Sequence, residues 1–178
     1  MQIVRPFVES RIFPGIKFVR RALFGHSYGG LFVLHTLFTR PAAFNVYLAA
    51  SPSIWWNERF ILTEAEQFMG NVGSDNLMWP VLRLSYGSRE QYPVREPGES
   101  VAKFERRQIA AGKRRMTKNC GELYERLQES HTLSVLEMRE YADEDHGSVI
   151  APALTGALTF LSQLPILLPD APTWNKHS

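Results

Sequence analysis

The stretch Ala22-Leu23-Phe24-Gly25-His26-Ser27-Tyr28-Gly29-Gly30 decides the fold of this 178-residue chain. A short apolar run leads into a G-x-S-x-G sequence, and an apolar segment of helical length follows from Leu31 to Phe38. This order is typical of a nucleophile elbow, a sharp strand-to-helix turn that exposes a strained serine. Residues without a β-carbon beside the serine let the strand and the helix approach closely. We expect Ser27 to be a nucleophile and the backbone N–H of Tyr28 to face a developing oxyanion. The alternative is a glycine-rich turn with an incidental serine.

The composition limits the class of protein. With 178 residues, 44% of them hydrophobic, the chain has the size of one domain with a substantial core. Its formal net charge of +2 argues against nucleic-acid binding through overall charge. The single cysteine, Cys120, excludes an internal disulfide and a multi-cysteine metal site, and it suits a reducing compartment. No apolar run approaches the roughly 18 residues of a membrane span. We therefore expect neither a membrane nor a nucleic acid as partner, with the cytoplasm as the default location.

Strand patterns and helix patterns alternate along the chain. We expect strands over 16–24, 46–50, 81–85 and 133–141. A buried helix should follow Gly30 and end at Arg40-Pro41, and another helix should close the fold over 151–164. This alternation predicts a mostly parallel sheet flanked by helices, the layer arrangement of an α/β fold.

The two ends of the chain give separate expectations. The first ten residues predict an amphipathic helix with Ile3, Val4, Phe7 and Val8 on one side. Residues 1–164 are expected to form part of a single domain. Residues 165–178, with prolines at 165, 169 and 172, are expected to form an extended tail.

A basic insertion over 91–131 separates the third and fourth expected strands. Its section over 101–128 has helical character and carries Lys103, Arg106, Arg107, Lys113, Arg114, Arg115 and Lys118. A solvated helix face is one interpretation, and a basic rim that attracts an anionic ligand is another. A nucleic-acid role is less favoured because little aromatic character is interleaved with the charges.

A serine nucleophile needs a histidine that takes its proton, and the histidine needs an acid that fixes its tautomer. Five histidines are present. His146 lies in a polar turn between the fourth expected strand and the closing helix, where a catalytic histidine loop belongs. We expect the side chain of His26 to point away from that of Ser27, and His35 to pack within the buried helix.

The acid has three candidates. Glu90 is the best, because it follows the 81–85 strand in a turn on the same edge of the sheet as the elbow. Asp143 and Asp145 are rivals, although their closeness to His146 in sequence makes the geometry harder. A solvated Glu90 paired with Arg89 is the alternative without a catalytic role.

With these pieces placed, the chain resembles the "Putative esterase" family of α/β-hydrolases, the group that contains the ferric-siderophore esterases. The stretches that carry the resemblance are residues 20–32, Ala50-Ser51-Pro52-Ser53-Ile54-Trp55-Trp56-Asn57, and the turns over 86–91 and 144–150. The Trp55-Trp56 region and the basic insertion are most similar to the fungal branch, of the triacetylfusarinine C esterase type. The resemblance implies an α/β-hydrolase fold and hydrolysis of ester bonds in an iron-loaded hydroxamate siderophore, with iron released inside the cell.

The resemblance also implies roles for individual residues. It places the nucleophile on Ser27, the base on His146 and the acid on Glu90, although a Ser–His dyad in some siderophore esterases leaves the acid open. No metal or organic cofactor is implied, since the iron arrives with the substrate. Family members carry a long segment before the elbow, so we expect this chain to lack N-terminal strands and a second oxyanion donor.

Two tryptophans and two other functions complete the expectations. Trp55 and Trp56 follow the strand after the elbow helix, and we expect them to form an apolar wall for the substrate, with core packing as the alternative.

A general carboxylesterase, thioesterase or acyltransferase would use the same scaffold. A truncated, catalytically impaired hydrolase that acts as a binding protein is the third possibility.

Overall fold

The structure is a computed structural model, and it describes residues 3–70 and 80–165. Four parallel strands form one sheet in the order β1-β2-β3-β4, which is also their order along the chain. The strands are β1 (Ala22–His26), β2 (Val46–Ala50), β3 (Val81–Gly87) and β4 (Val135–Tyr141). The predicted parallel sheet is confirmed. The tail expected over 165–178 falls, after residue 165, outside the described residues.

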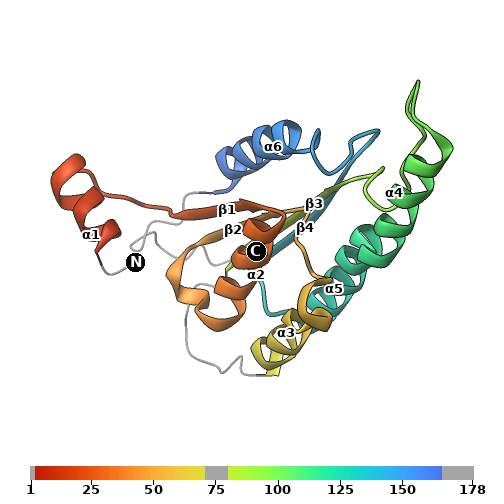
Figure 1. The fold of residues 1–178 in the computed structure, drawn as a ribbon. Helices are drawn as coiled ribbons and strands as arrows, with labels where there is room; N and C mark the ends of the chain where they lie inside the picture. Colours follow the sequence, from red (N-terminus) through yellow and green to blue (C-terminus); the bar gives the residue numbers. More distant parts are fainter. Residues whose placement is uncertain (1–2, 71–79, 166–178) are drawn as a thin grey trace, which may run out of the picture.

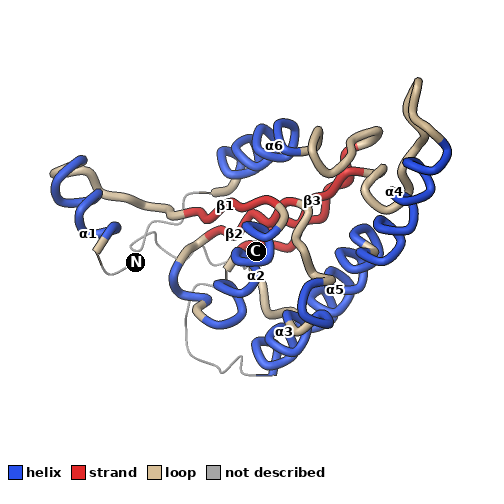
Figure 2. Tube along the Cα trace, viewed as in Figure 1, coloured by secondary structure: helices blue, strands red, loops and turns tan. Residues whose placement is uncertain are grey.

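Helices cover both faces of the sheet (Figure 1). The helices are α1 (Val4–Phe7), α2 (Tyr28–Thr39), α3 (Ile61–Gly70), α4 (Val101–Arg114), α5 (Met116–Ser130) and α6 (Ile150–Gln163). Helices α2, α3 and α5 lie on one face and α6 lies on the other (Figure 2). Short helical turns occur at Val8–Ile12, Pro41–Ala43 and Trp56–Arg59.

Strand β2 explains why the core has two sides. Its alternate residues Tyr47 and Ala49 pack in the cluster formed with α2, α3 and α5, whereas Val46 and Leu48 pack against α6. All five β2 residues are at most 4% exposed. A central parallel strand is covered on both faces, and it therefore reads as a continuous apolar run rather than as an alternating one.

The first strand begins later than the sequence pattern predicted. It starts at Ala22 instead of residue 16, because its partner strand β2 starts at Val46, which lies opposite Ala22. Just before this point, the Arg21 carbonyl accepts a hydrogen bond from the Asn45 N–H at 2.9 Å. Residues 16–21 have the strand pattern but no neighbouring strand to pair with in the described structure.

The N-terminal helix forms, but its apolar side is not buried. Helix α1 continues into a π-helical turn at Val8–Ile12, and no residue of either segment is buried. Ile3, Val4 and Phe7 are 82%, 68% and 56% exposed. Figure 1 shows this helix apart from the sheet and its covering helices.

The section of the insertion expected to have helical character forms two helices, α4 and α5. Arg115 adopts a left-handed conformation with φ 50° and separates α4 from α5. Helix α5 belongs to the core through Cys120, Leu123 and Leu127, whereas Ala111 is the one buried residue of α4. Most side chains of helix α4 are therefore exposed or partly exposed.

Candidate active site

The turn between β1 and α2 holds Ser27 in a strained conformation. Ser27 has φ 59° and ψ −117°, between the last residue of β1 and the first residue of α2. Such a conformation costs a non-glycine residue about 1–3 kcal/mol and persists only where surrounding contacts hold it. Two contacts do so: the Ser27 N–H donates to the Ala50 carbonyl at 3.0 Å, and the Ser27 carbonyl accepts from the Ser53 N–H at 3.1 Å.

Close approach requires glycine at two of the three positions around the serine. A β-carbon on Gly25 would clash with the carbonyl of Gly29, and one on Gly30 would lie 2.7 Å from the Ala50 carbonyl oxygen. A β-carbon on Gly29 would meet nothing within 4 Å. The steric requirement therefore falls on Gly25 and Gly30, and Gly29 contributes through its backbone alone.

The structure brings Ser27, His146 and Glu90 together in one chain of hydrogen bonds. The hydroxyl of Ser27 lies 2.9 Å from Nε2 of His146, and Nδ1 of His146 lies 2.7 Å from Oε2 of Glu90. A carboxylate only accepts, so Nδ1 carries the proton and donates it to Glu90. Nε2 is then the ring's acceptor for the Ser27 hydroxyl. This is the tautomer in which a histidine takes a proton from serine.

The carboxylate of Glu90 is fully enclosed and fixed at both oxygens. Its side chain is 0% exposed. Oε1 accepts the Ser51 hydroxyl at 2.5 Å and the Gly87 N–H at 2.7 Å, while Oε2 faces His146. These donors stabilise the buried charge and hold it in one orientation.

The rival acids are engaged elsewhere. Asp143 forms an ion pair with Arg89 at 2.7 Å, so Arg89 is not the partner of Glu90. Asp145 accepts the N–H groups of Gly147 and Ser148 at 2.8 and 2.9 Å. The Ser148 N–H is the main reason that the pKa of Asp145 lies below its usual value. Asp145 therefore shapes the His146 turn rather than contacting the imidazole.

A cleft of about 230 Å³ opens beside Ser27. Its lining residues are Ser27, Tyr28, Ser53, Trp55, Glu90, Arg114, Met116 and His146. The rings of Trp55 and Tyr28 face each other at 6.0 Å between centroids. Trp56 does not line this cleft and is 49% exposed. Of the two tryptophans expected to form a wall for the substrate, Trp55 lines the cleft beside Ser27.

Three polar residues of the site had no role in the sequence interpretation. Ser51 contacts Glu90, and Ser53 lies 3.3 Å from Ser27 between hydroxyl oxygens. His26 was expected only to point away from Ser27, and its ring lies 4.6 Å from that of His146. The Ser51-Pro52-Ser53 spacing at the end of β2 is the signal for the first two, since carboxyl ends of parallel strands share one edge. No sequence signal gives the contact of His26 with His146.

One further histidine differs from its expectation. His35 was expected to pack inside the buried helix, but its side chain is 50% exposed and pairs with Glu64 at 2.9 Å. Helix α2 buries Val33, Leu34, Thr36, Leu37 and Phe38 instead. A helix in contact with a sheet and another helix still keeps one exposed strip.

Two further findings concern metal binding and membrane crossing. Within residues 3–70 and 80–165, no group of three or more His, Cys, Asp or Glu residues could hold a metal ion. In the same part of the chain, every helix is too short or too polar to cross a bilayer.

A parallel sheet with a strained serine elbow after one strand, and a histidine and an acid after later strands, defines an α/β-hydrolase fold. The family model described as "Putative esterase" matches residues 5–113. The chain belongs to this family.

Individual relatives support the same assignment. The chain is 63% identical over 163 residues to "Siderophore enterobactin esterase" of Emericella nidulans, covering 92% of this chain and 54% of the relative. It is 44% identical to "Siderophore triacetylfusarinine C esterase" of Aspergillus fumigatus, covering 88% of this chain and 53% of the relative. The solved structure of siderophore hydrolase EstA from Aspergillus nidulans superposes with a TM-score of 0.87 at 63% identity, over 90% of this chain and 53% of that one. The chain thus spans about half the length of the curated relatives it matches.

Proposed function

We propose that this protein is a serine esterase that hydrolyses ester bonds of siderophores through an acyl-enzyme. The observation that carries the proposal is the hydrogen-bonded series Ser27–His146–Glu90, with 2.9 Å and 2.7 Å between the partner atoms. A hydroxyl, an imidazole in the accepting tautomer and a buried carboxylate are the three groups that acyl transfer needs.

The first half of the reaction forms the acyl-enzyme. The Ser27 oxygen attacks the ester carbonyl carbon while its proton passes to Nε2 of His146. Glu90 stabilises the imidazolium and keeps its orientation, and it does not itself take the proton. The tetrahedral intermediate then collapses, and the leaving alcohol oxygen takes the proton from Nε2.

The second half releases the acid. A water molecule gives one proton to His146 and attacks the acyl carbon, and Ser27 leaves with that proton. In both halves the carbonyl oxygen becomes negative. The Tyr28 N–H is our candidate donor to this oxygen, because it follows the serine at the N-terminus of α2, where N–H groups lack intrahelical partners.

The substrate class comes from the relatives. Two relatives are named for siderophore esters, enterobactin in one case and triacetylfusarinine C in the other. We propose the same class for this chain, including the hydroxamate ester that the resemblance implies as one member. No cofactor takes part in the steps above, and iron enters as part of the substrate. We also place the reaction in the cytoplasm, because a cell uses the iron that hydrolysis releases there.

Hydrolysis by the purified chain tests the proposal. Iron-loaded cyclic siderophore esters are incubated with the chain, and the products are identified by mass. We expect ring opening with the addition of one water per cleaved bond, and no opening with the Ser27→Ala variant. Equal rates for the two proteins, or cleavage of simple carboxylesters and thioesters but of no siderophore ester, would contradict it. Fractionation of source cells with an antibody against the chain checks the location.

A further inference from the structure

The turn that follows β2, Ser51-Pro52-Ser53, contacts both ends of the hydrogen-bonded series. The Ser53 N–H donates to the Ser27 carbonyl at 3.1 Å, and the hydroxyl oxygens of the two residues lie 3.3 Å apart. On its other side, the Ser51 hydroxyl donates to Oε1 of Glu90 at 2.5 Å. Strand β2 lies between β1 and β3 in the sheet, so the turn after it lies between the elbow and the turn that carries the acid. One turn therefore contacts the nucleophile and the acid together.

Ser51 is buried and its backbone is strained. The residue is 0% exposed, and its φ of 44° lies in the left-handed region that a residue with a β-carbon seldom adopts. Its N–H donates to the Ser85 carbonyl at 2.7 Å, which ties the turn to β3. Strained conformations of this kind persist where surrounding contacts hold them, and they cluster at active sites. In this conformation the Ser51 hydroxyl reaches Glu90.

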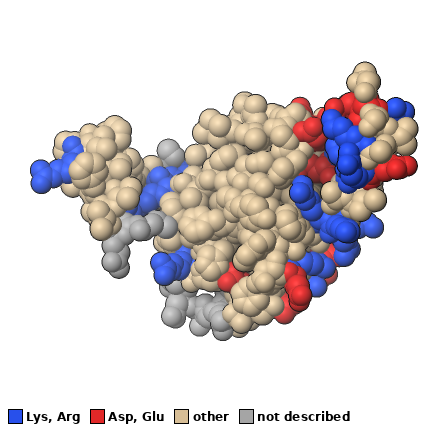
Figure 3. Space-filling model, viewed as in Figure 1, with Lys and Arg blue, Asp and Glu red and all other residues tan. Residues whose placement is uncertain are grey.

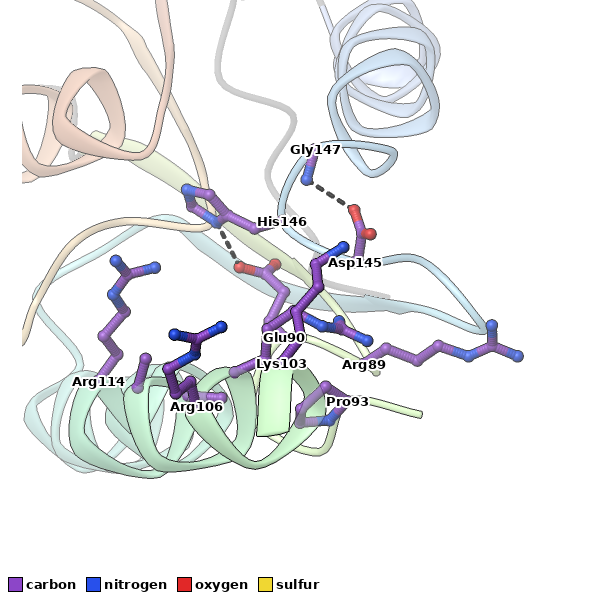
Figure 4. Close-up of a pocket in the computed structure, with 12 residues that line it drawn as sticks. Arg89, Glu90, Pro93, Lys103, Arg106, Arg114, Asp145, His146 and Gly147 are labelled. Carbon is purple, nitrogen blue, oxygen red and sulfur yellow. Dashed lines mark hydrogen bonds and ion pairs between the residues drawn. The ribbon is translucent and has the colours of Figure 1, made fainter. Parts of the chain in front are cut away.

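Within residues 3–70 and 80–165, no lysine or arginine pairs with the Glu90 carboxylate, whose ion-pair partner is His146. Lysines and arginines do gather at the end of the molecule that α4 and α5 form, with acidic residues among them (Figure 3). In Figure 4 the side chains of Arg106 and Arg114 rise from α4 toward the side of Glu90 and His146. Since neither guanidinium bonds to the carboxylate, its orientation depends on uncharged donors.

The two donors on Oε1 fix Glu90 relative to different parts of the fold. Gly87 lies in the same turn as Glu90, because the Glu90 N–H donates to the Gly87 carbonyl at 3.1 Å, and the Gly87 N–H donates to Oε1 at 2.7 Å. Ser51 belongs to the turn after β2, which also holds the elbow. Oε2 is left for His146, and Figure 4 shows the bond between the ring and this carboxylate. The Ser51 hydroxyl therefore sets the carboxylate relative to the nucleophile.

We propose that Ser51 is a positioning residue of the catalytic site: its hydroxyl holds Glu90 so that Oε2 faces Nδ1 of His146, which keeps the imidazole in the tautomer that takes the serine proton. Ser51 acts through Glu90 and not on the substrate, because it lines neither the cleft beside Ser27 nor the cavity under α4. The inference rests on the proposed function, since it concerns the site that performs the reaction.

Two substitutions separate the hydroxyl from the strained backbone. Ser51→Ala removes the hydroxyl and keeps a β-carbon at positive φ, whereas Ser51→Gly removes the hydroxyl and relieves the strain. With a small chromogenic ester, we expect each to lower kcat about tenfold to a hundredfold and to change KM less than about threefold. Thr36→Val, the control, removes another buried hydroxyl, bonded to the Phe32 carbonyl on α2, and should leave kcat unchanged. Full kcat in Ser51→Gly would overturn the inference.

A double-mutant cycle tests whether Ser51 acts through Glu90. If the hydroxyl acts on the carboxylate, Ser51→Ala has nothing left to misplace in a Glu90→Ala background. The second substitution should then lower kcat by less than about twofold. A loss as large as in the chain that retains Glu90 would mean that Ser51 acts on another group, and it would overturn the inference.

The tautomer of His146 gives a readout that needs no turnover. Nitrogen-15 NMR of the full chain with labelled histidine distinguishes a ring protonated at Nδ1 from one protonated at Nε2, at a pH well above the ordinary histidine pKa. The His146→Gln variant identifies the signals. We expect the Nδ1–H form in the unmutated chain and in Thr36→Val, and a mixture of both forms in Ser51→Ala and Ser51→Gly. The same single form in all four proteins would overturn the inference. If the tautomer changes as expected but the unmutated chain cleaves no ester, the proposed function fails while this inference stands.

Discussion

The imidazole of His26 lies against the imidazole of His146, with 4.6 Å between ring centroids and 40° between ring planes. His26 is the residue directly before the strained serine, so the elbow positions both Ser27 and one side of the His146 ring. Nε2 of His26 is buried and has no hydrogen-bond partner among the described residues. Burial first, and then the charge of His146, hold the pKa of His26 below its usual value. Both rings therefore lie in the site, and His146 is the one whose Nε2 contacts the Ser27 hydroxyl.

We expect His26 to support catalysis by packing against the ring of His146. His26→Ala should lower kcat about tenfold with little change in KM, because the His146 ring loses a packed neighbour, whereas His26→Phe should retain most of the activity. Kinetics with a small chromogenic ester check this expectation. Equal activity of His26→Ala and the unmutated chain would show that the contact does not position His146.

The lowered pKa of His26 predicts a pH effect on stability. A histidine with a lowered folded-state pKa is protonated first in the unfolded state, so the folded protein loses stability as pH falls below about 6.5. His26→Phe should lose less stability than the unmutated chain between about pH 7 and pH 5. Urea unfolding at these two pH values measures the difference, and parallel losses in the two proteins would contradict it.

Glu90→Gln should damage catalysis more than binding. If the amide oxygen keeps the Ser51 and Gly87 donors, its NH2 group faces Nδ1 of His146 and donates to it, which favours the tautomer that cannot take the Ser27 proton. Comparable changes in serine hydrolases cost about four orders of magnitude in kcat. We expect a loss of about two to four orders of magnitude, with KM changed less than about threefold. Glu129→Gln, at an exposed position on α5, is the matched control and should leave kcat unchanged. A Glu90→Gln variant with nearly full kcat would indicate that a Ser–His dyad suffices.

The glycines of the elbow give a contrast that the sequence motif does not predict. Gly30→Ala should destabilise the protein by about 1–3 kcal/mol, because its β-carbon would lie 2.7 Å from the Ala50 carbonyl oxygen and 3.0 Å from the Cα of Pro52. Gly29→Ala adds a β-carbon to open space in a helix and should leave the melting temperature unchanged or raise it. Thermal unfolding of the two variants measures this contrast. A larger fall in melting temperature for Gly29→Ala than for Gly30→Ala would show that the elbow packs differently.

The ion pair of Glu99 with Arg107 predicts acid sensitivity at the start of helix α4. Two hydrogen bonds from Arg107 lower the pKa of Glu99 from 4.5 to about 2. A carboxyl group with a lowered pKa stabilises the folded state above its unfolded pKa and loses that contribution as pH falls. The unmutated chain should therefore lose stability between pH 4.5 and about 2, and Glu99→Gln should lose less over this range. Glu105→Gln, on the exposed side of α4, is the control and should behave like the unmutated chain in acid unfolding. If Glu99→Gln and the unmutated chain gave the same acid unfolding curve, the role of the Glu99–Arg107 pair would be refuted.

The parts of the site that follow from strand order were predictable from the sequence. Ser27, Glu90 and His146 each come after a strand of one parallel sheet, and the carboxyl ends of such strands meet at one edge. The parallel sheet itself followed from the alternation of strand and helix patterns. These predictions depend on chain order and need no side-chain detail.

The remaining features depend on contacts between distant segments. The start of β1 at Ala22 is set by the position of β2, and the hydrogen bond from Ser51 to Glu90 requires the turn after β2 to meet the turn after β3. The break between α4 and α5 at Arg115 needs a left-handed residue where the sequence has no glycine. The first two features are fixed by how the strands of the sheet meet, so local patterns carry no information about them.

Labelling with a fluorophosphonate, read by intact mass, tests the central claim most directly, since the reagent reacts with a serine hydroxyl only where a base activates it. We predict one adduct on the folded chain, lost in Ser27→Ala, strongly slowed in Glu90→Gln and unchanged in Ser10→Ala, which removes an exposed serine hydroxyl far from the site. Absence of an adduct on the folded chain, or an adduct that persists in Ser27→Ala, would contradict the assignment of Ser27, His146 and Glu90 as a working catalytic site.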